Sequence, residues 1–224
     1  MTLSHAFNAA VQTMARTYCP NGWDVSPDLD VGSLEALQKA VAYNGRMIVW
    51  GGASDKTIYG DTETNYAYRA WHDACHLMGG FPFTLDGEQA ATRLQIRQLI
   101  SAYGRTNALT WGLLLHCEAV EQTVHFLNYE DFVDDQLRFT QDFLLAVRSH
   151  PSLSIRDVEL ACAGEGSWAG LRFTIGTLTV TPPPLEAWEI PQVSIPLRRP
   201  YKWTQFRGRN VKPAVVTRER EWTC

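Results

Sequence analysis

Apolar residues recur every three or four positions through most of the first 150 residues, which is the period of an amphipathic helix. One clear stripe consists of Leu94, Ile96, Leu99 and Ile100. Polar capping residues such as Ser33 and short glycine-containing breaks separate one stripe from the next. The pattern predicts six helices, at residues 4–18, 33–43, 61–77, 84–104, 107–126 and 131–147.

Two parts of the chain carry a strand-like pattern. Residues 46–50 are predicted to form either a short strand or a buried connection. Further along, Val158, Leu160 and Cys162 recur at every second position, and a similar run continues to Val180. Glycines interrupt these runs, as they do between the strands of a hairpin. We therefore predict a small antiparallel β element in this region.

Proline changes the character of the last part of the chain. Seven of the 11 prolines lie within the last 43 residues. This density excludes helices and central strands, and so predicts an extended arm. The expected fold class is mainly α. It comprises a helical, bundle-like body at residues 1–149, the β element at 150–181 and the arm at 182–224.

Composition places the chain among globular proteins. It has 224 residues, of which 45% are hydrophobic and 20% charged, and no apolar run approaches the roughly 20 residues of a membrane span. The five cysteines are scattered without CxxC spacing, so we expect a reducing compartment such as the cytoplasm, with a virion as the alternative. The first 17 residues have no secretory or transit pattern.

The net charge of −4 hides a strong asymmetry. Residues 198–224 hold eight basic and two acidic side chains, whereas the rest of the chain holds 12 basic and 22 acidic ones. A basic arm and an acidic body predict contacts between copies of the chain, in a homo-oligomer or larger assembly formed through residues 182–224. The arm also interleaves basic and aromatic residues, so binding of single-stranded nucleic acid is the less favoured alternative.

The predicted third helix carries the motif that points most directly to chemistry. His72 and His76 lie four residues apart, so both imidazoles project from one face of a helix. Asp73 flanks the same site, and Glu88 opens the next helix after a Gly-Gly turn, where its carboxylate can reach back. His72, Asp73, His76 and Glu88 are therefore the predicted metal ligands.

Two imidazoles and one or two carboxylates suit Zn²⁺, with Fe²⁺ or Mn²⁺ as alternatives. An open coordination position would hold a water that the metal acidifies, and Asp73 is the expected base. The competing interpretation is a pair of hydrogen-bonded core histidines. The surrounding apolar residues, among them Trp71 and Phe81, favour the metal, because burying these polar groups without partners is costly.

The predicted fifth helix adds a further carboxylate. Leu114, Glu118, Glu121 and His125 follow a helical spacing, so we expect them on one face. Glu118 is the second candidate catalytic residue, either facing the substrate or contacting a metal ligand, and a solvated position on the helix is the competing interpretation. Glu121 is expected on a solvated stripe, and His116 on a different face as a hydrogen-bonded histidine.

The spacing HDxxH-x11-E, carried by His72, Asp73, His76 and Glu88, resembles the zinc-ligand motif of the coenzyme Q biosynthesis protein 4 family. The resemblance implies that these four residues bind zinc in a mostly helical protein. It also implies an apolar cavity for a prenylated aromatic ring, and loss of a ring C1 substituent as the reaction. More faintly, the segment around Tyr68 is similar to uncharacterised bacteriophage-encoded proteins with an HD-like helix.

Other metal enzymes fit the sequence less well. An HD phosphohydrolase needs a further upstream histidine, and the only one here, His5, lies in a different predicted helix. A di-iron bundle needs two Glu-x-x-His pairs, and the sequence contains none. The expected function is a metal-dependent enzyme, a lyase or hydrolase, acting on a small, partly apolar substrate. The alternative is a non-catalytic structural or interaction protein, such as a phage assembly or virion component, whose arm docks on neighbouring subunits or nucleic acid.

Overall fold

The computed structural model describes residues 3–27, 31–149 and 154–165. The predicted arm at 182–224, most of the predicted β element and Cys224 therefore lie outside the described residues. Among the described helices, none combines the length and apolar character needed to cross a bilayer. The four cysteines within the described ranges are buried free thiols.

Each of the six predicted helical stretches is helical in the structure, which confirms a mainly α fold. Ser33 caps the second helix by accepting a hydrogen bond from the Ala36 backbone N–H, as its sequence position suggested. The helices are α1 (His5–Tyr18), α2 (Leu34–Asn44), α3 (Thr62–Gly79), α4 (Leu85–Tyr103), α5 (Arg105–His116), α6 (Gln122–Tyr129), α7 (Gln136–Ser149) and α8 (Ile155–Cys162), and a π-helical turn, η1 (Cys117–Glu121), joins α5 to α6.

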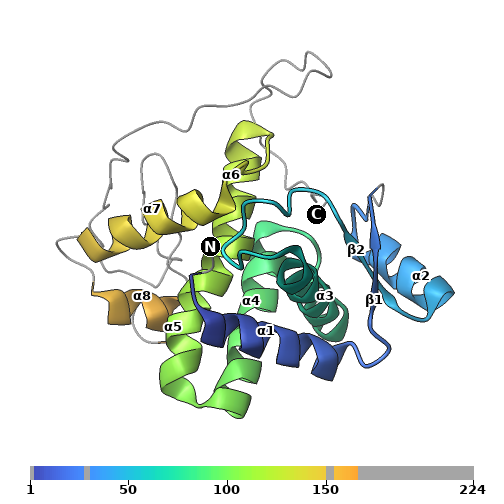
Figure 1. Ribbon diagram of the computed structural model, residues 1–224, viewed down its shortest axis with the longest axis horizontal. Coiled ribbons are helices and arrows are strands. Elements are labelled where there is room, and N and C mark those ends of the chain that lie inside the picture. Colours follow the sequence, from blue (N-terminus) through green and yellow to red (C-terminus); the bar gives the residue numbers. More distant parts are fainter. Residues whose placement is uncertain (1–2, 28–30, 150–153, 166–224) are drawn as a thin grey trace, which may run out of the picture.

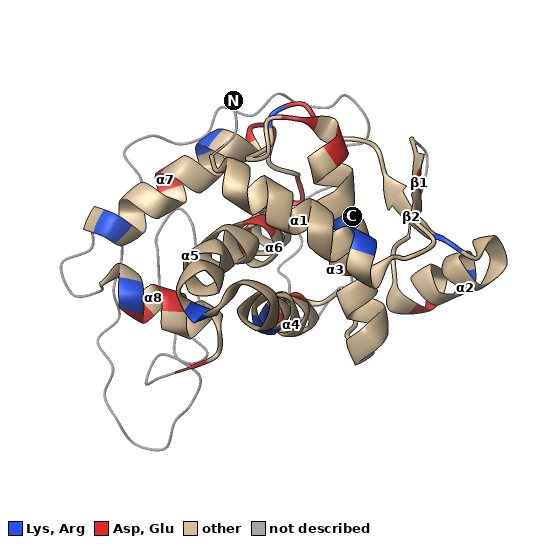
Figure 2. Cartoon of the chain, turned by 60° about the horizontal axis from the view of Figure 1, so that its bottom comes forward, with Lys and Arg blue, Asp and Glu red and all other residues tan. Residues whose placement is uncertain are grey.

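Helix α3 lies near the centre of the molecule and packs against α1 and α4, while α4 packs in turn against α5 (Figure 1). Trp71 of α3 is fully buried in this core, where its indole N–H donates to the Gln98 side chain of α4 at 2.6 Å. Charged residues are spread over many of the helices, among them α2, α4, α7 and α8 (Figure 2). The contact between α3 and α4 is an interior one, since Trp71, His76 and Glu88 are all 0% exposed, and the predicted metal ligands lie there.

The sheet differs from the predicted one in place and in direction. It has two strands, β1 (Trp23–Ser26) and β2 (Met47–Trp50), and they pair in parallel with Trp23 opposite Met47. The strand alternative for residues 46–50 is thus confirmed. The pairing is parallel because the chain returns to the same end of the sheet through α2, whereas a tight hairpin would have reversed it.

The antiparallel prediction is wrong at its first segment, because residues 155–162 form helix α8. The Ser154 and Asp157 side chains form a capping box at its start. Val158, Ala161 and Cys162 are buried at helical spacing, and Leu160 is only partly buried. An every-second-residue pattern of three apolar positions is too short to distinguish a strand from a helix, and the Ser-x-x-Asp signal favoured the helix.

Candidate metal centre

The end of α3 and the start of α4 bring three predicted ligands together. His72 and His76 lie one turn apart on α3, which ends at Gly80 in the left-handed conformation with φ of 64°. Helix α4 begins only five residues later, where the Thr84 hydroxyl caps it by accepting from the Gly87 N–H. This short connection places Glu88, in the first turn of α4, opposite the two histidines.

The ligand atoms of these three residues converge on one point in the interior. The Nε2 atoms of His72 and His76 lie 3.0 Å apart, and Glu88 places one carboxylate oxygen 2.8 Å from His72 Nε2 and the other 3.3 Å from His76 Nε2. Atoms arranged tetrahedrally around zinc, each about 2.0 to 2.1 Å from it, lie about 3.3 Å from one another. His72, His76 and Glu88 are therefore a group that could hold a metal ion.

The outer nitrogen of each histidine contacts a carbonyl oxygen. His72 Nδ1 lies 3.1 Å from Gln95 Oε1, and His76 Nδ1 lies 3.0 Å from the backbone oxygen of Phe81. A carbonyl oxygen can only accept, so each Nδ1 carries a proton, and each Nε2 faces the interior of the group. Protein-bound metal ions commonly have histidine ligands held in this way.

The two Nε2 atoms and the Glu88 carboxylate meet in a buried site, where either a proton on Nε2 or a metal cation can lie between them. All three side chains are buried, and Glu88 Oε1 has no hydrogen-bond partner. Burial disfavours the charged carboxylate, but the charges and hydrogen bonds of His76 and His72 in their protonated forms lower the pKa of Glu88 to about 2. Glu88 is thus ionised at neutral pH, and the site has the charge and the donor atoms that a divalent cation requires.

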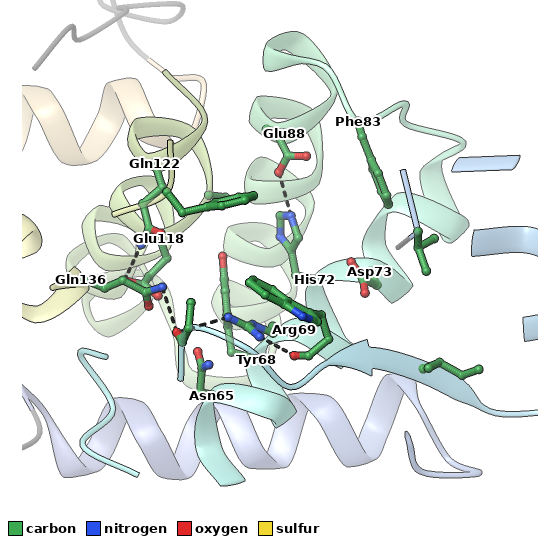
Figure 3. Close-up of a pocket in the computed structure, with 16 residues that line it drawn as sticks. Asn65, Tyr68, Arg69, His72, Asp73, Phe83, Glu88, Glu118, Gln122 and Gln136 are labelled. Atoms are coloured by element: carbon green, nitrogen blue, oxygen red, sulfur yellow. Dashed lines mark hydrogen bonds and ion pairs between the residues drawn. The ribbon is translucent and has the colours of Figure 1, made fainter. Parts of the chain in front are cut away.

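Asp73, the fourth predicted ligand, does not belong to this group of three. It lines the cavity beside the group, together with His72 and Glu88 (Figure 3). Burial raises the pKa of Asp73 to about 6, against the lowering effect of the histidines. The structure therefore places Asp73 next to the candidate metal position and separates it from the convergent ligand atoms.

The cavity has a volume of about 70 Å³ and extends from the metal group between α3, the turn η1 and strand β2. One water needs about 10 to 15 Å³ on this measure, so the cavity has room for a small molecule. Most of its wall area is apolar, and polar side chains are interspersed with the apolar ones. The lining residues that surround the metal group and Asp73 are Val31, Ile48, Trp50, Ala53, Asn65, Tyr68, Arg69, Phe83, Glu118, Ala119, Gln122, Phe132 and Gln136.

Glu118, the second candidate catalytic residue, lines the cavity. It is 7% exposed, and one of its carboxylate oxygens accepts a hydrogen bond of 3.1 Å from the Gln122 amide. Burial raises the pKa of Glu118 to about 8, although Arg69 lowers it. The side chain is therefore mostly protonated at neutral pH, while Glu88 in the same cavity is ionised.

Glu118 and Glu121 do not share a face, contrary to the prediction. Residues 117–121 form a π-helical turn, and its i→i+5 hydrogen bonds widen the helix. Glu121 is buried, and its carboxylate lies 3.0 Å from His116 Nε2, away from the cavity lining. The predicted solvated stripe at Glu121 is therefore wrong, whereas the expectation that His116 is hydrogen-bonded is confirmed.

Sequence reasoning missed several residues of the site. Gln95 lies seven residues after Glu88, two helical turns along one face of α4, and this spacing could have revealed it. Arg69, one turn before Asp73 on α3, donates to the backbone oxygens of Trp50 and Gly52 and so fixes a wall of the cavity. No sequence spacing indicates that contact, because the segment that contains Trp50 and Gly52 meets α3 only in the tertiary structure.

Comparison of the chain with known protein families, with curated proteins and with solved structures finds no match. Function is therefore inferred from the residues of the site. Three buried ligand atoms around one point, a protonated carboxyl group and an ionised one in the same cavity are the chemical features available for that inference.

Proposed function

We propose that the protein is a metal-dependent enzyme, a lyase or hydrolase, that acts on a small and partly apolar substrate. The observation that carries the proposal is the convergence of His72, His76 and Glu88, with the two histidine Nε2 atoms 3.0 Å apart at one buried point. A divalent ion bound there would polarise a ligand in an open coordination position.

Three protein ligands favour a catalytic role over a structural one. Structural zinc sites usually have four protein ligands, whereas catalytic sites have three and keep a position for water or substrate. His72 and Glu88 also line the cavity, so a ligand in it would reach the open side of the ion. Zinc is the proposed metal, with iron or manganese as alternatives, since two histidines and one carboxylate suit all three.

The two remaining carboxyl groups of the cavity suit opposite proton-transfer roles. Burial holds the pKa of Glu118 at about 8, so this group can donate a proton at neutral pH. The pKa of Asp73 is about 6, so this group is mostly ionised and can accept one. A cavity in which environments separate the pKa values of neighbouring carboxyl groups is typical of general acid–base catalysis.

The cavity supports the proposed substrate class. Trp50, Phe83 and Phe132 provide flat apolar walls, while Asn65 and Gln122 provide polar contacts on the side away from the metal group (Figure 3). Ligand sites commonly combine such walls with a few polar groups that set orientation. A molecule with one apolar face and one metal-binding oxygen or nitrogen would fit this arrangement.

Cobalt substitution tests whether the site is open. We expect the Co²⁺-loaded protein to show visible absorption bands that shift when azide is added, because azide enters an open coordination position. The His76→Ala variant should lack these bands, and Glu118→Gln should retain them. Bands that azide does not alter would identify a closed, structural site and contradict the proposed enzymatic role.

A further inference from the structure

The pairing of His116 with Glu121 depends on the π-helical turn between them. The two residues are five positions apart, which places them about 140° apart around an ideal α-helix of 3.6 residues per turn. In η1 the i→i+5 repeat brings them onto one face, and His116 Nε2 lies 3.0 Å from Glu121 Oε1. The pair could not form if the helix continued regularly from α5 into α6.

The same turn determines the direction of Glu118. In a regular α-helix, Glu118 and Glu121 would lie about 60° apart and share a face. In the structure Glu118 lines the cavity and hydrogen-bonds Gln122, whereas Glu121 contacts His116 away from the cavity. The π-turn thus divides two nearby carboxyl groups between two environments.

We propose that the His116–Glu121 pair is a positioning device that stabilises the π-turn and thereby holds Glu118 in the cavity, facing the metal group. The catalytic importance of that position rests on the proposed function, but the positioning itself does not. His116 and Glu121 are positioning residues, because neither lines the cavity.

Burial explains why this pair can fix the backbone. The His116 and Glu121 side chains are 5% and 0% exposed, so a helix register that separated them would deprive the buried Glu121 carboxylate of the hydrogen bond from His116. A π-turn is rare in proteins and occurs often at functional sites. The pair therefore supplies a specific interaction that only the π register permits.

The test replaces both partners with leucine. His116→Leu/Glu121→Leu avoids leaving one buried charge, and replacing a buried pair with apolar residues often preserves folding. We expect a crystal structure of this variant to show i→i+4 hydrogen bonds across residues 117–121, with Glu118 turned out of the cavity. Its pKa, followed by carbon-detected NMR of labelled glutamate, should fall from about 8 toward the ordinary value of about 4.3.

The matched control is Glu121→Gln, whose amide oxygen can still accept a hydrogen bond from His116. This variant should keep the π-turn and leave the pKa of Glu118 unchanged. The charged or titratable groups that act on Glu118 are Arg69 of α3, Tyr59 and Cys117, and none of them is altered. An unchanged π-turn and an unchanged Glu118 pKa in the double leucine variant would overturn the inference.

Metal content measured on the same samples separates this inference from the proposed function. A wild-type protein that binds no metal would overturn the proposed enzyme, while the Glu118 titration would still decide whether the pair positions that side chain. Conversely, bound metal together with an unmoved Glu118 in the double leucine variant would overturn only the positioning role.

Discussion

The Nε2 atoms of His72 and His76 lie 3.0 Å apart in the protein interior, and each ring donates its Nδ1 proton to a carbonyl oxygen. Once the protons on Nε2 are lost, the two lone pairs and the ionised Glu88 surround one point, which a metal cation can occupy. The contact between these two histidines is therefore the feature on which a metal-binding account of the protein depends.

Gln95 should determine how tightly that cation binds. Gln95→Leu removes the acceptor for His72 Nδ1, and loss of such an outer contact typically lowers metal affinity 10- to 100-fold. Gln98→Leu is the matched control, since Gln98 is also buried on α4 but accepts from Trp71. Competition with a chelating dye measures both affinities. Equal affinities in the two variants would show that Gln95 does not orient His72.

Asp73 and Glu88 should differ in their effect on metal content. Glu88→Gln removes one of three convergent ligands and should abolish stoichiometric binding. Asp73→Asn leaves all three in place and should retain one ion per chain. Elemental analysis after dialysis distinguishes the variants. If Asp73→Asn loses its metal as completely as Glu88→Gln, then the four-ligand set implied by the sequence resemblance is correct and the three-ligand group is wrong.

Gly87 should be needed for the placement of Glu88. A Cβ atom at Gly87 would lie 1.8 Å from the backbone oxygen of Pro82, so Gly87→Ala must displace the start of α4. Gly80→Ala is the control: its Cβ has open space, and its φ of 64° costs about 1 to 2 kcal/mol in a residue with a side chain. Both variants should unfold at lower denaturant concentration, but only Gly87→Ala should also weaken metal binding. Unchanged metal affinity in Gly87→Ala would contradict this role.

The buried His116–Glu121 pair should make stability fall at alkaline pH. Burial disfavours the imidazolium, but Cys162 and Glu121 raise the pKa of His116 to about 10, against about 6.5 in an unfolded chain. The folded-state pKa of His116 is higher than its unfolded-state pKa. The stabilisation that protonated His116 provides is therefore complete below a pH of about 6.5, and it is lost as the pH rises to about 10.

Urea unfolding at a series of pH values measures this effect. The free energy of unfolding of the wild type should decrease over that range by about 3 to 5 kcal/mol, the cost of losing one partner of a buried pair. His116→Leu should show a smaller decrease than the wild type over the same range. Parallel pH profiles for the two proteins would show that His116 does not carry the effect.

Much of the metal group could be predicted from the sequence because it depends on local rules. The four-residue spacing of His72 and His76 fixes their common face in any α-helix, and the Gly-Gly turn limits how far Glu88 can lie from them. The role of Asp73 could not be resolved in this way. Its position next to His72 is compatible with a ligand or a cavity-lining residue, and only the directions of the side chains distinguish the two.

Other features depend on interactions that no periodicity reveals. The common face expected for Glu118 and Glu121 assumed 3.6 residues per turn, and the π-turn breaks that assumption through the contact between His116 and Glu121. Strand β1 (Trp23–Ser26) has only four residues and is defined by its parallel partner, which lies more than 20 residues away along the chain. Neither the π-turn nor strand β1 can be predicted without the tertiary structure.

The metal content of the protein purified without added chelator tests the central claim most directly. We expect elemental analysis to find about one zinc, iron or manganese ion per chain in the wild type. His76→Ala should retain the helical circular dichroism spectrum and lose that ion. A wild-type protein that carries no metal, and that takes up none of the three ions when they are supplied, would contradict the claim that His72, His76 and Glu88 form a metal centre.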